Sequence, residues 1–171
     1  MSSLFAPTTR LQTVTALFLA LAMAATVGSA LGFQHIGGYI PCKLCYEQRT
    51  PYYVGAPLML VAFVTAAAGL PGLVTRGLLL VGAAIMAYGL YLGVYHSGVE
   101  WGWWAGPTDC GMVVAPSDTG GNGVLDQIDK VMPPSCDKAA LRILGLSLAG
   151  WNAIASLVLG AVALRGAFSR G

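Results

Sequence analysis

Long apolar stretches alternate with short polar segments along this chain. Four stretches, at about residues 13–33, 52–70, 73–95 and 141–164, carry almost no charged side chains. Each is close to the roughly 20 residues that an α-helix needs to cross a hydrocarbon core of about 30 Å. A spanning segment must satisfy its own backbone hydrogen bonds within lipid, so the pattern predicts helices. We expect an all-α membrane protein, a four-transmembrane-helix bundle that forms a single integral membrane domain over residues 1–171.

The first apolar stretch has a second interpretation. Arg10 precedes it, and Val27-Gly28-Ser29-Ala30 resembles the cleavage site of a secretory signal peptide. However, its apolar run of about 21 residues exceeds the roughly 7 to 15 of a signal-peptide core. We therefore interpret it as a retained transmembrane helix.

Composition supports a membrane protein and excludes a nucleic-acid-binding one. The chain is 56% hydrophobic and only 9% charged, whereas a soluble domain carries about 25% charged residues. Lipid must therefore cover much of its surface. The net charge is +2, with no block of lysine or arginine, so nothing favours nucleic-acid binding.

All four cysteines fall on one predicted side of the membrane. Four spans place both termini on the same side, and loops 34–51 and 96–140 on the other. These loops contain Cys42, Cys45, Cys110 and Cys136. Lysine and arginine counts do not decide the orientation, but disulfides persist in the periplasm or outside the cell. We therefore expect cytoplasmic termini and periplasmic cysteines.

The second loop has a predicted element of its own. Apolar residues recur at helical spacing over residues 124–132, and Pro133-Pro134 ends the pattern. This indicates a short amphipathic helix, lying on the membrane surface or packed on the bundle. Trp101, Trp103 and Trp104 follow the third span and are typical of an interfacial aromatic belt.

The segment Pro41-Cys42-Lys43-Leu44-Cys45 carries the main candidate chemistry. A CxxC pair is suited to a redox couple or to half of a metal site. A structural zinc site usually pairs two close doublets, and this chain has only one, so zinc is not favoured. Structural disulfides are the stronger alternative. Against them, Lys43 and Arg49 would favour thiolates electrostatically, which a structural disulfide does not need.

Electrons that reach this pair need an acceptor. No nucleotide or flavin fingerprint is present, whereas a quinone can reach the bilayer surface by lateral diffusion. Arg49 could polarise a quinone oxygen, or it could simply anchor a helix end. His96 could lie near the quinone or be a polar helix-end residue, and Glu100 is spaced to pair with it. Haem ligation by His35 and His96 would leave the cysteines unexplained.

Several motifs together resemble the DsbB family, the disulfide bond formation protein B of bacterial inner membranes. They are Phe33-Gln34-His35, Pro41-Cys42-Lys43-Leu44-Cys45, Gln48-Arg49 with Pro51-Tyr52-Tyr53, Tyr95-His96, Gly106-Pro107 with Cys110, Cys136, Gly145-Leu146 and Trp151-Asn152. The resemblance covers essentially the whole chain. It implies a thiol:quinone oxidoreductase of the inner membrane that reoxidises a periplasmic DsbA-like thiol oxidase and passes the electrons to ubiquinone or menaquinone, with no metal and no haem.

The resemblance also implies a role for each site residue. The partner's thiolate would attack Cys110 of a Cys110–Cys136 disulfide, and Cys136 would then attack Cys42. Cys45 would face the quinone beside Arg49, with His96 nearby. Lys43 departs from the apolar or small residue expected in that spacer, which we expect to shift the redox poise without abolishing function.

Two other functions remain open at this point. A vitamin K epoxide reductase-like protein also combines a helical bundle, loop cysteines and a quinone, but its quinone-facing CxxC follows the loop pair, whereas here it comes first. A non-catalytic membrane scaffold with structural disulfides is the other alternative, and its cysteines would not respond to an added quinone.

Overall fold

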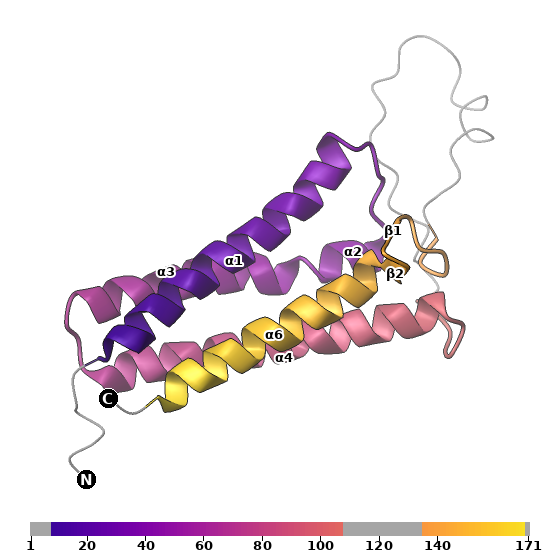
Figure 1. Cartoon of the computed structure of the whole chain (residues 1–171). Coiled ribbons are helices and arrows are strands. Elements are labelled where there is room, and N and C mark those ends of the chain that lie inside the picture. The colour runs from indigo at the N-terminus through magenta and orange to yellow at the C-terminus, as the bar shows by residue number, and fades with distance from the viewer. Residues whose placement is uncertain (1–7, 108–134, 170–171) are drawn as a thin grey trace.

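Four long helices form the body of the molecule (Figure 1). The computed structural model describes residues 8–107 and 135–169. The predicted amphipathic helix at 124–132 lies outside the described residues. In chain order the elements are α1 Arg10–His35, α2 Lys43–Glu47, α3 Thr50–Ala67, α4 Gly72–Glu100, β1 Arg142–Ile143, β2 Leu146–Ser147 and α6 Leu148–Phe168.

The long helices are apolar and long enough to cross a membrane, with α2 and α3 counting as one segment, Lys43–Ala67. Their outer faces carry large apolar side chains, and Leu21, Val64 and Leu157 are each more than half exposed. An apolar surface of this extent is stable against lipid and not against water. The prediction of a four-helix membrane bundle is confirmed.

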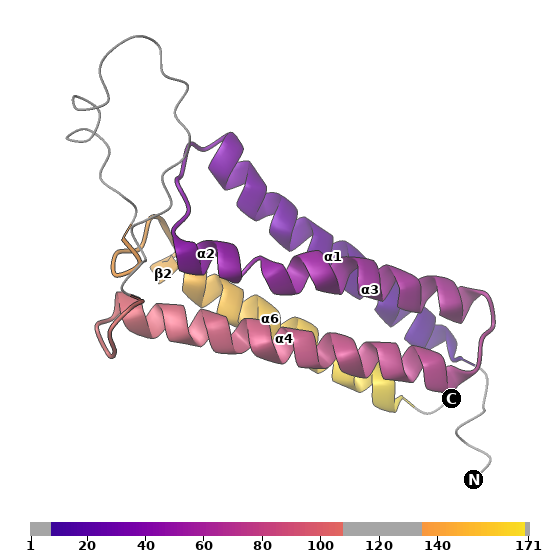
Figure 2. The ribbon, with the colours of Figure 1, turned by 180° about the vertical axis from the view of Figure 1, so that it is seen from behind.

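The bundle has two distinct ends. α1 begins and α6 ends at one end, where α3 also turns into α4. α2 and the β1–β2 hairpin lie together at the opposite end (Figure 2). Two spans, α3 and α4, separate the segment that contains Cys42 and Cys45 from the segment that contains Cys136. The chain therefore comes back to the same end of the bundle, and the described cysteines lie there together.

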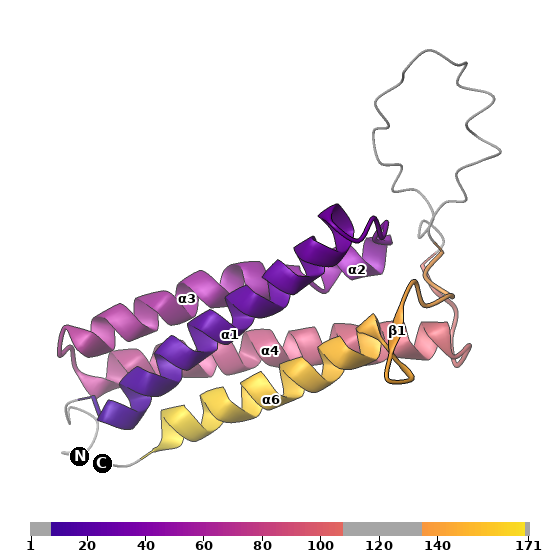
Figure 3. The same cartoon turned by 45° about the horizontal axis from the view of Figure 1, so that its top comes forward.

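The helices approach one another through small residues. A Cβ atom added at Gly93 of α4 would lie 2.8 Å from the backbone nitrogen of Ala153 of α6, and one at Gly89 would lie 2.9 Å from Ser156 Oγ. Glycine is needed at such close crossings, which are typical of membrane bundles. α1, by contrast, diverges from α4 and α6 toward its C-terminal end (Figure 3). The bundle is therefore closed at one end and wedge-shaped at the cysteine end.

The fourth helix begins at Leu148, not at the expected residue 141. Arg142 pairs with Ser147 and Ile143 with Leu146 in a two-stranded antiparallel ladder. Leu144 and Gly145, which join the strands, have φ angles of 53° and 83°, the conformation of a tight type I′ hairpin turn and not of a helix. Ser147 then caps α6 by accepting a hydrogen bond from the Gly150 N–H at 3.2 Å. This ladder is the one departure from the all-α expectation within the described residues.

The first predicted cysteine loop is shorter than expected, and the second begins later along the chain, after Glu100. α2 and the start of α3 occupy much of the segment 34–51, and α4 continues through His96 to Glu100. The extension of α4 is stabilised by burial, because His96 is 3% exposed and Val99 is 4% exposed. His96 and Glu100 are therefore on the last turns of a helix, in fixed positions relative to α2.

Candidate functional site

The CxxC segment forms the first turn of a short helix. Cys42 is the N-cap of α2, and its Sγ accepts a hydrogen bond from the Cys45 backbone N–H at 3.4 Å. The two sulfur atoms are hydrogen-bonded to each other at 3.0 Å, and both cysteines are free. The two-residue spacer thus places both sulfurs side by side on one helical turn, as a dithiol–disulfide couple requires.

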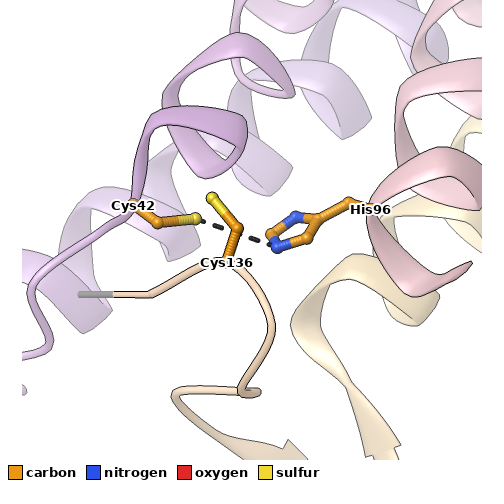
Figure 4. Close-up of side chains that lie close together, drawn as sticks. All are labelled: Cys42, His96 and Cys136. Atoms are coloured by element: carbon orange, nitrogen blue, oxygen red, sulfur yellow. Dashed lines mark hydrogen bonds between the residues drawn. The ribbon is translucent and has the colours of Figure 1, made fainter. Parts of the chain in front are cut away.

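Cys136 brings a third sulfur to the same place, from the segment that precedes β1. It is 2% exposed and disulfide-bonded; because Cys42 and Cys45 are free, its partner lies outside the described residues. The sulfurs of Cys42 and Cys136 and a ring nitrogen of His96 all lie within 4.8 Å of one another, and Figure 4 shows these side chains converging. Only a short movement separates Cys42 and Cys136 from the S–S distance of about 2.05 Å.

His96 links three neighbours at this cluster. The Gln48 side-chain nitrogen is hydrogen-bonded to His96 Nδ1. Which of the two groups donates in this hydrogen bond depends on the tautomer of the imidazole and on the orientation of the amide. His96 Nε2 is 3.8 Å from Cys42 Sγ and 3.8 Å from Glu100 Oε1. The imidazole therefore presents its Nε2 side to a sulfur and a carboxyl group at once.

This environment favours the thiolate of Cys42. The hydrogen bond with the Cys45 side chain is the main cause, and His96 adds a hydrogen bond and a Coulombic attraction; together they outweigh burial and lower the pKa of the Cys42 thiol from 9.0 to about 5. A thiolate is the form that exchanges with disulfides. Of the two free cysteines that the structure describes, Cys42 is thus the one whose thiolate is favoured at neutral pH.

Cys45 also lines a cavity of about 440 Å³. It lies between α1, the α2–α3 segment and the start of α6, where α1 diverges. Most of its lining is apolar; the exceptions include Cys45, Gln48, Arg49 and Asn152. An apolar cavity with a few polar groups at one end is suited to a small amphipathic organic molecule.

Arg49 is held rigidly at the wall of this cavity. It is 9% exposed, and its guanidinium donates to Gln34 Oε1 and, at 3.5 Å, to the carbonyl oxygen of Ala30, both on α1. The guanidinium carbon also lies 5.2 Å from the centroid of the Tyr46 ring, a cation–π arrangement. These contacts leave a charged donor at the cavity with a defined orientation.

A polar network closes the cavity toward the core. The Tyr52 hydroxyl donates to Asn152 Oδ1 at 2.7 Å and is also hydrogen-bonded to Ser156 Oγ at 3.0 Å. Asn152 Nδ2 donates to the Gly89 carbonyl oxygen at 3.4 Å. The network connects α3, α6 and α4, so it fixes the cavity wall opposite α1.

The structure brings five of the six predicted site residues to one end of the bundle; the sixth, Cys110, lies outside the described residues. Their distribution is uneven. Cys45 and Arg49 line the large cavity. His96 does not; it lines a small cavity of about 40 Å³, which both Cys42 and Cys45 also line. The expectation that His96 lies near the bound quinone stays a prediction, and its described contacts are with Cys42, Gln48 and Glu100.

Sequence reasoning did not assign roles to several residues that the site contains. Gln34 orients Arg49, Gln48 orients His96, and Tyr52 and Asn152 form the cavity wall. Each is a polar residue in or next to an apolar segment, where polar groups are costly unless they are paired. That signal was visible in the sequence, but the pairings depend on helix rotation, which the sequence does not show.

The converging side chains of Cys42, His96 and Cys136 are also of the types that bind soft metal ions. A metal ligand must be a thiolate, and Cys136 is disulfide-bonded. In the described state the sulfur of Cys136 is therefore not available as a thiolate ligand.

Comparison with known families agrees with this geometry. Residues 12–165 of the 171 match the family described as disulfide bond formation protein DsbB. No curated protein and no solved structure matches the chain. The match extends over all four long helices and over Cys42, Cys45 and Cys136. The chain therefore belongs to the DsbB family of membrane oxidoreductases that act in disulfide-bond formation.

Proposed function

We propose that this protein is a thiol:quinone oxidoreductase that reoxidises a periplasmic DsbA-like thiol oxidase and passes the electrons to ubiquinone or menaquinone. One observation supports this most strongly. The sulfurs of Cys42 and Cys45 are in contact, yet Cys42 lies beside the sulfur of Cys136 whereas Cys45 lines the large apolar cavity. A single dithiol thus adjoins a disulfide on one side and a binding site on the other.

The exchange half of the reaction starts at the second cysteine pair. A thiolate of the partner attacks Cys110 of a Cys110–Cys136 disulfide, so a mixed disulfide forms and Cys136 leaves as a thiolate. Cys136 then attacks Cys42 of an oxidised Cys42–Cys45 pair: the Cys42–Cys136 bond forms, the Cys42–Cys45 bond breaks, and Cys45 leaves as a thiolate. The closeness of Cys42 and Cys136 supports the second step.

The chain then returns to its starting state. The partner's second thiolate attacks its mixed disulfide and leaves oxidised, which frees Cys110. Cys110 attacks Cys136, restores the Cys110–Cys136 bond and releases Cys42 as a thiolate, a good leaving group because of its low pKa. Two electrons now reside on Cys42 and Cys45, and closing that disulfide requires an acceptor.

The large cavity fits a quinone headgroup as that acceptor. When bound, a quinone takes up two electrons and two protons. Arg49 offers a charged donor for a quinone oxygen, and Cys45 places a sulfur at the same cavity. The apolar lining suits the ring and its substituents, and the divergence of α1 opens this region toward the lipid from which such a molecule would arrive.

The placement in the cell follows from the same chemistry. We place the protein in the bacterial inner membrane, with both termini cytoplasmic and the cysteine end periplasmic. Its described disulfide at Cys136 supports an oxidising compartment for that end.

The test is an electron-transfer assay with the purified full-length protein. A reduced DsbA-like protein is added together with ubiquinone-1 or a soluble menaquinone analogue, and quinone reduction is followed by absorbance. The proposal expects stoichiometric partner oxidation that requires the quinone. Unchanged cysteine redox states after quinone addition would instead identify a scaffold with structural disulfides.

A further inference from the structure

Glu100 is a buried carboxyl group that the proposed reaction does not use. Its side chain is 4% exposed, and its Oε2 has no hydrogen-bond partner among the described residues. It is also the last residue of α4, where the negative end of the helix dipole disfavours a carboxylate. Burial and position both make this residue costly for stability, so a functional reason for its presence is needed.

The contact that Glu100 makes leads directly to the reacting sulfur. Glu100 Oε1 is 3.8 Å from His96 Nε2, and that same nitrogen is 3.8 Å from Cys42 Sγ. Both residues are on α4, one helical turn apart, and both are almost fully buried. In this order, a carboxyl group can influence the ionisation of the thiol through the histidine that lies between them.

We propose that Glu100 is a positioning residue that acts through His96 on Cys42 and maintains the thiolate during exchange with Cys136. This inference rests on the proposed function, because it concerns the rate of that exchange. A carboxylate beside His96 stabilises the imidazolium form. The imidazolium donates from Nε2 to the Cys42 thiolate and stabilises its negative charge.

The proton balance of this arrangement is simple. In the tautomer with the ring proton on Nδ1, Nε2 accepts the thiol proton of Cys42: the S–H bond breaks, an N–H bond forms at Nε2, and the ring becomes imidazolium. Gln48 suits both the neutral ring and the imidazolium, because rotation of its amide presents the oxygen to the Nδ1–H. No oxidant or further reactant is needed, and the electrons stay on sulfur until the exchange itself.

Other charged or titratable groups around Cys42 must be considered as alternatives. Cys45 on α2 contacts it directly. Cys136 and Lys138, on the segment before β1, face the same small cavity or cluster. Arg49 acts electrostatically on Cys45. Among these groups only Glu100 is a buried carboxyl group next to His96, so its removal has a distinct expected effect.

The test measures the reactivity of Cys42 itself. Glu100→Gln keeps the shape of the side chain and removes its charge. The full-length protein is reduced, and the alkylation rate of Cys42 by iodoacetamide is followed against pH by mass spectrometry of the peptide that contains it. We expect the apparent pKa of Cys42 to rise by about one unit, a tenfold lower thiolate-to-thiol ratio at a given pH. Glu100→Asp should restore part of the shift.

Controls separate this role from a general effect on folding. Glu47→Gln, at a partly exposed glutamate of α2, should leave the profile unchanged. In a His96→Ala background, Glu100→Gln should have no further effect, because the action passes through the histidine. An unshifted profile in Glu100→Gln, or an equal shift with and without His96, would overturn the inference.

Failure of the proposed function would look different. If the protein does not reduce quinone but Glu100→Gln still shifts the Cys42 profile, the relay stands and the proposed acceptor is wrong. If quinone reduction is normal and the Cys42 profile does not shift, the proposed function stands and the proposed role of Glu100 is wrong.

Discussion

The two sides of the CxxC pair differ in the size and in the polarity of the space beside them. The Cys42 side is a tight, polar cluster with His96, Glu100 and the Cys136 sulfur, around a cavity of only about 40 Å³. The Cys45 side is a cavity of about 440 Å³ with mostly apolar walls. The first arrangement excludes any ligand larger than a water molecule or two, and the second admits a ring-sized molecule. Two chemically equal cysteines thus acquire different partners from their surroundings alone.

The largest loss of activity is expected when either sulfur of the CxxC pair is removed. Cys42→Ser removes the exchange with Cys136, and Cys45→Ser removes the route to the acceptor; each should lower quinone-dependent turnover by about a thousandfold or more. The two variants should still differ. Cys45→Ser retains the neighbouring pair and should accumulate a Cys42–Cys136 disulfide, detectable by non-reducing peptide mapping, whereas wild-type turnover in both variants would refute the electron route.

Arg49→Gln should affect only the large-cavity side. Loss of a charged hydrogen bond to the quinone should raise the KM for quinone by about 10- to 100-fold, while alkylation of Cys42 stays near normal. Arg165→Gln, at an exposed arginine of α6 toward the other end of the bundle, is the matched control. A larger effect of Arg49→Gln on Cys42 reactivity than on quinone KM would show that the two sides are not separate.

The pH dependence of alkylation tests the environment on the Cys42 side of the pair. The pKa of Cys42 is lowered to about 5, so its thiolate is fully present at neutral pH and is lost as pH falls through that value. The alkylation rate should therefore be flat from about pH 6 to 8 and fall about tenfold per unit well below pH 5. An inflection near the ordinary value of 9.0 would contradict the described environment.

The smallest effect is expected at the cavity wall. Tyr52→Phe removes the hydroxyl that binds Asn152 and Ser156 and should lower the free energy of unfolding by about 1 kcal/mol. Thermal unfolding in detergent measures this, with Tyr53→Phe, at a half-exposed ring, as the control. Equal losses in both variants would show that the network adds nothing to the wall.

The hydrophobic pattern of the sequence predicted most of the fold. Four spans could be predicted because every residue in lipid contributes to the same signal. The start of α6 could not be predicted, because the apolar segment already includes residues 142 and 143. The left-handed conformation of Leu144, which interrupts it, is explained only by the local hairpin. Sequence patterns report how apolar a segment is, and not where a turn interrupts it.

The site could be predicted less evenly. The cysteine pair and Arg49 were identified from their residue types and spacing, and they lie together. His96 was expected either near the quinone or as a polar helix-end residue, and its described contacts are with Cys42, Gln48 and Glu100. Which face of α4 turns toward which cavity depends on helix rotation and on the glycine contact at Gly93 with α6. Neither has a signature in a single sequence.

The small β1–β2 hairpin has a kinetic consequence. It is attached to α6, where Trp151 Nε1 donates to the Ile143 carbonyl oxygen at 3.0 Å, and only residues 137–141 separate it from Cys136, which precedes it in the chain. At about 3.4 Å per extended residue such a tether reaches about 20 Å at most. In the proposed reaction Cys136, once released as a thiolate, thus remains at a high effective concentration near Cys42. The proposed exchange between these sulfurs is therefore first-order, with a rate independent of how dilute the protein is in its membrane.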